Sequence, residues 1–206
     1  MSLSEQEIIR RQALQEIRGL GIDPFPAAGF EITSSSSKVK EGFSEGAAGF
    51  EGIQIAGRIM SRRIMGKASF VEIQDESGRI QLYISRDNIC PDEDKTLYNK
   101  VFKKLLDIGD IIGIKGDAFI TKTGETTIKV FELKLLSKSL RPLPIVKTDA
   151  EGQEHDAFSD PELRYRQRYV DLIVNPEVKE AFEKRTRMYN SMREYLNAKG
   201  YLEVET

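Results

Sequence analysis

Two neighbouring predicted strands place an aromatic ring and a carboxamide on one polar face. Alternating apolar residues predict strands over residues 68–74 and 79–84, because successive side chains of a strand point to opposite faces. In the first strand the apolar positions form one face, so Phe70 lies on the other. By the same alternation, Gln81 and Tyr83 lie on the polar face of the second strand.

These side chains suit an unpaired nucleobase. A flat aromatic ring stacks on any base with roughly 1–3 kcal/mol. A carboxamide carries both a donor and an acceptor, so it can read one base edge. Each residue alone has a plainer interpretation: a loop could cover Phe70, and Gln81 could be an ordinary solvated strand residue. Their occurrence on one face favours a nucleic-acid-binding surface.

Basic residues gather beside this face. Residues 52–71 contain no acidic residue and four basic ones, which are Arg58, Arg62, Arg63 and Lys67. Such a cluster binds phosphates, with an affinity that falls as salt rises. The alternative is a solvated basic edge that deters sheet pairing. Glu125 lies at a predicted turn, where its carboxylate could accept a hydrogen bond from a base N–H or simply be solvated.

The composition excludes several other classes of protein. The chain has 206 residues, of which 39% are hydrophobic and 31% charged, with a net charge of -2, as in a globular protein rather than a disordered one. No apolar run is long enough to span a membrane, and the first 20 residues do not resemble a signal peptide. A single cysteine, Cys90, and a single histidine, His155, argue against a disulfide scaffold, a zinc site and a Cys–His nucleophile pair. We therefore expect a reducing, cytoplasmic location.

The central part of the chain has the element order of a small barrel. Residues 91–106 carry a helical stripe of leucine and valine, with acidic residues near the start and lysines near the end. This helix lies between the third and fourth of five predicted strands, which cover residues 53–63, 68–74, 79–84, 111–121 and 126–136. Three strands, a helix and two strands are the order of an OB-fold, a Greek-key barrel used on oligonucleotides and oligosaccharides.

Helices flank this barrel on both sides. A capping box at residues 4–7 begins an N-terminal helix, whereas the Gly- and Ser-rich residues 24–50 predict a connection without a stable helix. Beyond the Pro-containing linker 140–144, a long helix is expected from the N-cap Asn175 to Gly200, followed by an alternating strand over 201–206. The fold class is mainly β with flanking helices, in four segments: 1–50, 51–141 (the OB-fold domain), 142–174 (a hinge) and 175–206.

Several motifs, in the same order, resemble the anticodon-binding OB-fold of bacterial lysyl-tRNA synthetases. They are Gly57–Phe70, Gly78–Tyr83, Thr121–Glu125, Leu140–Pro144 and Arg164–Leu172. Residues 200–206 look like the first of the three class II synthetase motifs, cut before its proline. The resemblance covers nearly the whole chain and is weak over 24–50. It implies that residues 175–206 begin an α+β class II catalytic domain that is truncated here.

Two alternatives remain beside the lysine type. Aspartyl- and asparaginyl-tRNA synthetases share the barrel, the phenylalanine and the glutamine, but they usually carry an arginine where this chain has Gln74. A stand-alone OB module that binds single strands would need no ligase at all. The segments at residues 62–67 and 122–125 resemble the lysine type.

The resemblance implies roles for particular residues. Phe70 would stack on the central anticodon uridine, and Gln81 and Arg63 would hydrogen-bond that base or its neighbour. Glu125 would contact an anticodon base near the turn, and Arg58 would serve the same face. No catalytic or metal-binding residue is predicted, and the candidate nucleic-acid-binding residues are Arg58, Arg63, Lys67, Phe70, Gln81 and Glu125.

The resemblance also implies an activity for a longer protein. In the family, the second and third motifs bind ATP, Mg²⁺ and lysine, form lysyl-adenylate and pass the lysyl group to tRNA(Lys). Positions that would carry these motifs lie beyond Thr206. We therefore expect this chain to bind the tRNA anticodon loop without activating lysine, and to need neither ATP nor Mg²⁺ itself. The long helix would contribute to a homodimer of the full enzyme, and no membrane partner is implied.

Overall fold

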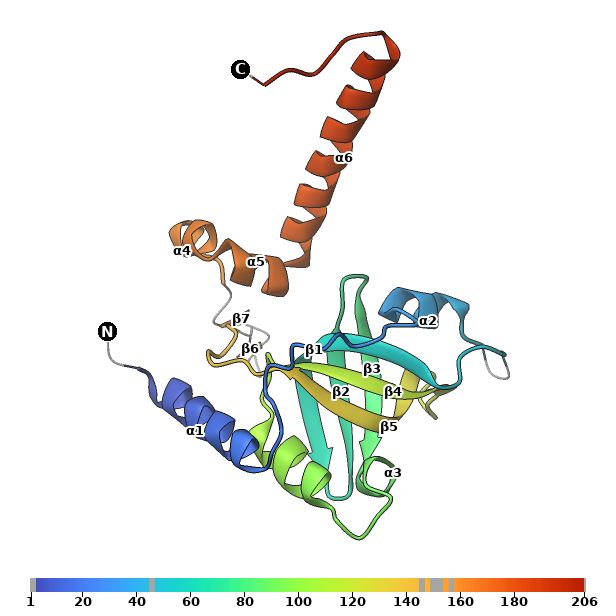
Figure 1. Ribbon diagram of the computed structural model, residues 1–206, viewed down its shortest axis with the longest axis vertical. Coiled ribbons are helices and arrows are strands. Elements are labelled where there is room, and N and C mark those ends of the chain that lie inside the picture. Colours follow the sequence, from blue (N-terminus) through green and yellow to red (C-terminus); the bar gives the residue numbers. More distant parts are fainter. Residues whose placement is uncertain (1–2, 45–46, 145–146, 149–153, 156–157, 206) are drawn as a thin grey trace. The chain divides into compact units, whose positions relative to one another are not determined.

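The computed structural model describes residues 3–44, 47–144, 147–148, 154–155 and 158–205. The chain divides into two compact units, Met1–Pro142 and Leu143–Thr206, which are described separately. In the first unit, five strands close into a barrel in the order β1-β2-β3-β5-β4 (Figure 1). The strands are β1 (Ile53–Met65), β2 (Ala68–Gln74), β3 (Arg79–Ser85), β4 (Ile111–Ile120) and β5 (Thr126–Ser137).

The strand pairing confirms the predicted OB-fold. β1, β2 and β3 form an antiparallel meander, and β4 pairs antiparallel with both β1 and β5. The parallel pairing of β3 with β5 closes the ring. Sequence alternation located all five strands, with ends that differ from the predicted ones by no more than two residues.

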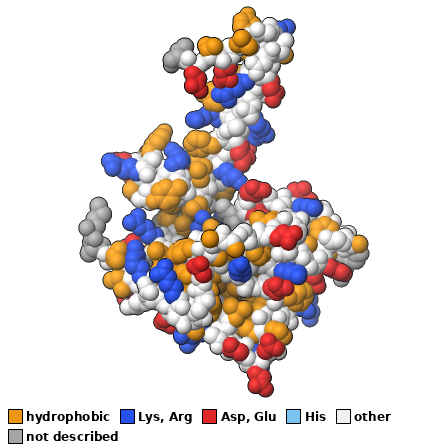
Figure 2. Space-filling view, in the orientation of Figure 1, with side chains coloured by type: hydrophobic (Ala, Val, Ile, Leu, Met, Phe, Trp, Pro, Cys, Tyr) orange, Lys and Arg blue, Asp and Glu red, His pale blue; other side chains and the backbone are white. Residues whose placement is uncertain are grey.

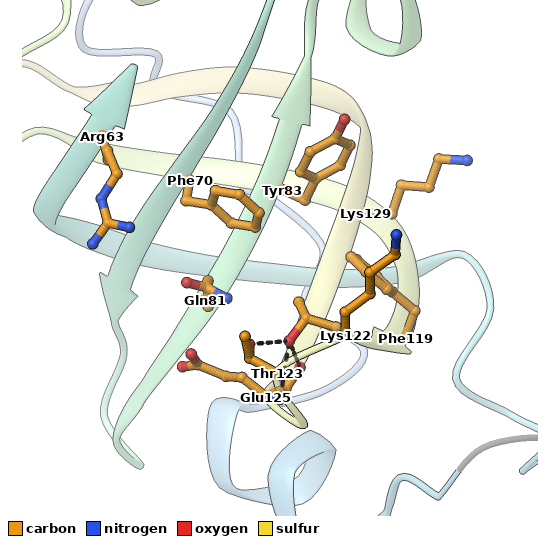
Figure 3. A pocket seen from close by; sticks show the side chains of 10 residues that line it. Arg63, Phe70, Gln81, Tyr83, Phe119, Lys122, Thr123, Glu125 and Lys129 are labelled. Carbon is orange, nitrogen blue, oxygen red and sulfur yellow. Dashed lines mark hydrogen bonds between the residues drawn. The ribbon is translucent and has the colours of Figure 1, made fainter. Parts of the chain in front are cut away.

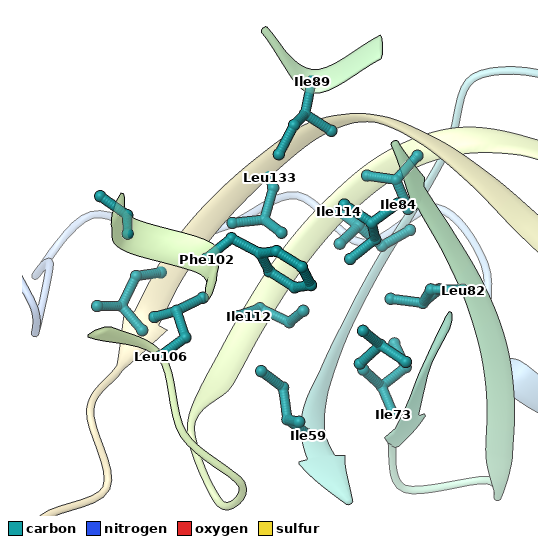
Figure 4. Packing of buried hydrophobic residues seen from close by; sticks show 14 of the residues in the cluster. Ile59, Ile73, Leu82, Ile84, Ile89, Phe102, Leu106, Ile112, Ile114 and Leu133 are labelled. Atoms are coloured by element: carbon teal, nitrogen blue, oxygen red, sulfur yellow. The ribbon is translucent and has the colours of Figure 1, made fainter. Parts of the chain in front are cut away.

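The inward side chains of the five strands fill the barrel with branched apolar residues (Figure 4). Ile59, Ile73 and Leu82 are among those with no exposed surface. The barrel also requires a close backbone approach between β4 and β5. A Cβ atom on Gly116 would lie 2.1 Å from the carbonyl oxygen of Lys129, so only glycine fits there.

The helix between β3 and β4 is shorter than predicted. Instead of covering 91–106, it begins at Leu97 and ends at Leu105, and its bonds follow the i→i+5 pattern of a π-helix; we call it η1. A four-residue helix, α3 (Arg86–Ile89), precedes it. Between the two, Asp94 accepts from the amide of Thr96 at 2.8 Å, a local turn that delays the start of η1.

The buried face of η1 includes two aromatic residues outside the predicted leucine and valine stripe. Tyr98 and Phe102 are fully buried, and their rings stack with centroids 5.4 Å apart. The Tyr98 hydroxyl lies 3.0 Å from the hydroxyl of buried Ser69, so its polar tip is satisfied inside the core. This hydrogen bond allows a tyrosine to occupy a core position.

The N-terminal helix α1 (Glu5–Gly19) has the predicted capping box. The Ser4 hydroxyl accepts from the Glu7 amide, and the Glu7 carboxylate accepts from the Ser4 amide at 2.9 Å. Its buried face includes Leu14 and Ile17, whereas Ile8 is 45% exposed. α1 packs against η1, and the Arg10 guanidinium donates to the carbonyl of Ile108 at 3.0 Å.

Residues 24–50 contain a helix that composition argued against. This helix, α2 (Ser36–Gly42), begins after the N-cap Ser35 and ends at a glycine, so the glycines beyond it do not interrupt it. The Asp75 carboxylate, in the turn between β2 and β3, accepts from the Ser36 amide at 2.6 Å. Burial alone would raise the pKa of Asp75, but hydrogen bonds from Ser36 and Ser77 outweigh it and lower the pKa. A charged acceptor contributed by the barrel therefore holds the first turn of α2.

The second unit is mainly helical. It contains a short pairing of β6 (Lys147–Thr148) with β7 (Glu154–His155), followed by three helices. The backbone of His155, the single histidine, lies in β7. The helices are α4 (Pro161–Arg166), α5 (Arg168–Val174) and α6 (Pro176–Ala198).

Two details of the second unit differ from the prediction. The long helix starts where expected, but Asn175 does not cap it through its side chain, which donates instead to the Asp171 carboxylate at 2.6 Å. Asp171 is fully buried and also accepts from Arg164 and Arg168. The predicted strand at 201–206 is wrong for the described residues 201–205, where no neighbouring strand satisfies the backbone. Thr206 lies outside the described residues.

Helix α6 exposes apolar side chains along much of its length, seen as orange patches in Figure 2. Met188, Met192 and Tyr195 are 53%, 54% and 65% exposed, respectively. A helix with such a face is typical of a surface that another element or chain covers.

Candidate nucleic-acid interface

A cavity of about 850 Å³ opens on the outer face of the barrel (Figure 3). The sheet contributes its floor, and the turn between β4 and β5 contributes one wall. Its lining residues are Arg63, Phe70, Gln81, Tyr83, Phe119, Thr121, Lys122, Thr123, Glu125 and Lys129.

Three aromatic rings from three strands line the cavity in sequence. Phe70 of β2 lies directly opposite Tyr83 of β3 in the strand register, and their ring centroids are 5.4 Å apart. Phe119 of β4 meets Tyr83 edge-on, at 6.2 Å and 80°. Phe70 is partly exposed rather than covered by a loop. The cavity therefore offers apolar ring surface of the kind on which bases stack.

The turn between β4 and β5 is held by its own hydrogen bonds. The Thr121 amide donates to the Glu125 carbonyl at 3.0 Å, and the Glu125 amide donates to the Thr121 hydroxyl at 3.0 Å. Gly124 has a φ of +85°, a conformation that costs glycine little. The exposed carboxylate of Glu125 is thus attached to a well-defined backbone.

The Gln81 carboxamide is held at the floor of the cavity. Its Nε2 donates to the Thr127 hydroxyl oxygen at 2.9 Å, and the two residues are directly paired between β3 and β5. In Figure 3 the Gln81 oxygen lies on the side of the cavity that faces Arg63. The side chain thus offers its carbonyl as an acceptor to a bound group.

The charges around the cavity are mainly positive. Arg63 is exposed and lies opposite Phe70 in the β1–β2 register. Lys122 and Lys129 line the side formed by β5 and its turn, and Glu125 is the one acidic residue among the lining residues. Three cations around aromatic rings suit a single-stranded nucleic acid, whose backbone carries a negative charge at every nucleotide.

The structure brings together four of the six predicted site residues, Arg63, Phe70, Gln81 and Glu125. Lys67 is exposed at the turn between β1 and β2, outside the lining of the cavity. Arg58 also lies outside it: its Nη1 donates to the Gly109 carbonyl at 2.7 Å. Burial lowers the pKa of Arg58, and nearby Asp110 opposes this shift.

Arg62 shows why the basic cluster of residues 52–71 does not act as a single patch. It lies opposite Val71 in the register, with its guanidinium at the end of η1. Its Nη1 donates to the carbonyls of Phe102 and Leu106, at 2.6 and 2.8 Å. Arg62 and Arg58 thus donate to backbone carbonyls of η1 and of the segment between η1 and β4, and Arg63 and Lys67 remain exposed.

Sequence reasoning did not assign the six other lining residues to the site, which are Tyr83, Phe119, Thr121, Lys122, Thr123 and Lys129. Alternation placed Tyr83 on the polar face without a role. The same alternation around buried Ile128 and Val130 marks Lys129 as outward, so this signal was present in the sequence. Phe119 follows a bulge between β4 and β5, which alternation within one strand does not reveal.

Comparison with known proteins agrees with this geometry. Residues 53–136 match a family of tRNA anticodon domains, described as an OB-fold nucleic acid binding domain. Residues 160–206 match the class II tRNA synthetases (D, K and N). The chain is 59% identical over 204 residues to a lysine–tRNA ligase of Azobacteroides pseudotrichonymphae, an alignment that covers 99% of this chain and 40% of that protein.

Over almost its whole length the chain is thus homologous to lysine–tRNA ligases. Lysine–tRNA ligases of Christiangramia forsetii and of a Thermoanaerobacter species are 58% and 48% identical to it, again over 99% of the chain. The chain spans only 35% to 40% of the length of these relatives. Its residues 53–136 are therefore an OB-fold domain of the tRNA anticodon type.

The described residues do not supply the donor set for a metal. No group of three or more His, Cys, Asp or Glu side chains in that part of the chain could hold an ion. The helices of the described part also include none long and apolar enough to cross a membrane.

Proposed function

We propose that this chain binds the anticodon loop of tRNA(Lys), through the cavity on the outer face of its barrel. The observation that carries the proposal is the grouping of Phe70, Gln81, Arg63 and Glu125 around one cavity. Phe70 stacks on an unpaired base, and Gln81 reads its edge. Arg63 hydrogen-bonds that base or its neighbour, and Glu125 accepts from a base near the turn. Lys67 and Arg58 contribute only to the general positive field.

The geometry supports an unpaired loop rather than a duplex. Ring faces accept bases only after these have left a helical stack, as anticodon bases do. The β4–β5 turn and Arg63 lie on different sides of the rings, so a strand can pass between them (Figure 3). The 55% to 59% identity to lysine–tRNA ligases supports the lysine type over the aspartate and asparagine types.

An equilibrium titration with three RNA stem-loops tests the proposal. The loops share one stem and carry the anticodons UUU, GUC and GUU. We expect the UUU loop to bind with the lowest Kd, because Glu125 on the lysine-type turn would contact an anticodon base beside the central uridine, and the three loops differ only at those positions. Equal affinity for the three loops would contradict lysine identity and favour a general single-strand-binding module. An unlabelled stem without the loop serves as the competitor that measures backbone binding alone.

For the protein of which such a domain is part, we propose the reaction of the family. It would attach lysine to tRNA(Lys) in the cytoplasm, through an ATP-derived lysyl-adenylate with Mg²⁺. The exposed apolar face of α6 would then be covered in a homodimer. The family resemblance supports these statements. In such a protein, the described residues of this chain would bind the tRNA.

A further inference from the structure

A chain of hydrogen bonds runs beneath the cavity floor from the β4–β5 turn to Gln81. The Thr127 hydroxyl donates to the Glu125 carbonyl at 3.2 Å and accepts from Gln81 Nε2 at 2.9 Å. Thr127 has no exposed surface. Water therefore does not compete for its hydroxyl, and the direction of this chain depends on the protein groups around it.

The single proton of the Thr127 hydroxyl determines that direction. The Glu125 carbonyl is the only acceptor that the described residues offer this proton, apart from Gln81 itself. The Thr121 hydroxyl lies as close to the carbonyl, but it has a second partner in the Thr123 hydroxyl at 3.0 Å. While the Thr127 hydroxyl donates its hydrogen to the Glu125 carbonyl, it presents only lone pairs to Gln81. Only the NH₂ group of the carboxamide can donate to these lone pairs.

Reversing the Gln81 carboxamide would leave one hydrogen bond in place of two. The Gln81 oxygen would face the Thr127 oxygen, and Thr127 would have to withdraw its proton from Glu125 to relieve the repulsion. Its proton would then bond to the Gln81 oxygen, and the oxygens of Thr127 and Glu125 would face each other without a proton between them, with Thr127 buried from water. Unmade buried hydrogen bonds are costly, so the observed orientation is preferred.

We propose that Thr127 is a positioning residue that fixes the orientation of the Gln81 carboxamide, so that its carbonyl oxygen faces the bound base. This inference rests on the proposed function and deepens it. A fixed acceptor selects a base that presents an N–H at that point. Uracil has N3–H where cytosine has a lone pair, so Thr127 indirectly sets the preference for uracil over cytosine at the base read by Gln81.

The first test needs no RNA. In nuclear magnetic resonance spectra of the free chain, the Gln81 NH₂ protons should exchange with water more slowly than those of exposed Gln6. Thr127→Val keeps the side-chain volume but removes the hydroxyl, and should raise the Gln81 exchange rate to that of Gln6. Thr127→Ser should retain slow exchange. Fast exchange of the Gln81 protons in the unmodified chain would overturn the proposal.

The second test compares a UUU stem-loop with a UCU stem-loop. In the unmodified chain the UUU loop should bind more tightly, and Thr127→Val should reduce the ratio of the two Kd values by about 3- to 10-fold, the usual worth of one net hydrogen bond. Thr127→Ser should restore the ratio. In a Gln81→Ala background, where the carboxamide is already absent, Thr127→Val should cause no further change in the ratio of the two Kd values.

A purely structural role for Thr127 gives a different result. It would weaken both loops equally and leave their Kd ratio unchanged, which would overturn the proposal. If the unmodified chain bound neither loop, the proposed function would fall. The exchange rates of the Gln81 protons would still decide whether Thr127 fixes the carboxamide.

Discussion

Replacing Phe70 by alanine should weaken the binding of every anticodon loop to a similar extent. Phe70 lies directly opposite Tyr83 and lines the cavity, so its ring is the surface best placed to stack on a base. The loss should be roughly 1–3 kcal/mol, or about 5- to 150-fold in Kd. Since every base has a flat face, the order of preference among the UUU, GUC and GUU loops should remain unchanged. Titrations of the three loops at one salt concentration measure this.

The matched control for this variant is Phe25→Ala. Phe25 is 42% exposed and is not one of the residues that line the cavity. Its replacement should leave all three Kd values unchanged. Circular dichroism should show both variants folded. If the Phe70→Ala chain binds the UUU loop as tightly as the unmodified chain, the proposed stacking of Phe70 on a base is wrong.

The largest loss of stability should come from Lys138→Met. Lys138 lies just beyond β5, and its ammonium has no exposed surface. It donates to the Asp110 carboxylate at 2.9 Å, and that carboxylate is equally buried. Removing one partner of a buried ion pair leaves the other charge uncompensated, which typically costs about 3–5 kcal/mol. Urea unfolding at pH 7, followed by the near-ultraviolet circular dichroism of the aromatic side chains, measures the loss.

The loss should depend on pH in a defined direction. Burial raises the pKa of Asp110 even with Lys138 beside it, and removing the ammonium should raise it further. A raised folded-state pKa means that stability is greatest below the unfolded-state pKa and falls as pH rises through the folded-state pKa. The difference between Lys138→Met and the unmodified chain should therefore be largest at pH 7 and shrink as Asp110 becomes protonated towards pH 4.

Two controls accompany this variant. Lys134→Met changes an exposed lysine of β5 and should alter the unfolding free energy by less than about 0.5 kcal/mol. The double variant Asp110→Asn with Lys138→Met removes both charges and should recover part of the loss. A Lys138→Met chain as stable as the Lys134→Met chain would show that this buried pair does not stabilise the barrel.

The barrel was predictable because apolar and polar residues alternate along its strands, most regularly in β2 and β3. Ile80, Leu82 and Ile84 are all fully buried, as this alternation requires. The same alternation placed Phe70 and Gln81 on the face where the cavity lies. Features that depend on local periodicity were therefore accessible from the sequence alone.

Features that depend on contacts between distant residues were not accessible. Helix α2 depends on the hydrogen bond between the Ser36 amide and Asp75, which lies 39 positions away. A prediction from the local glycine content therefore missed this helix. Arg58 and Arg62 belong to a basic run in the sequence, but their partners are carbonyls 40 or more positions away. The role proposed for Thr127 depends on a parallel pairing of β3 with β5 that closes only in the folded barrel.

The central claim is that a nucleotide binds between the aromatic rings and the β4–β5 turn. The most direct measurement is a titration of the isotopically labelled chain with the UUU stem-loop, in which nuclear magnetic resonance follows each side chain. We expect saturable shifts centred on Phe70, Gln81 and Tyr83 and on the turn at 121–125, with α1 unaffected. Saturable shifts centred on any other surface, with these residues unchanged, would contradict the account.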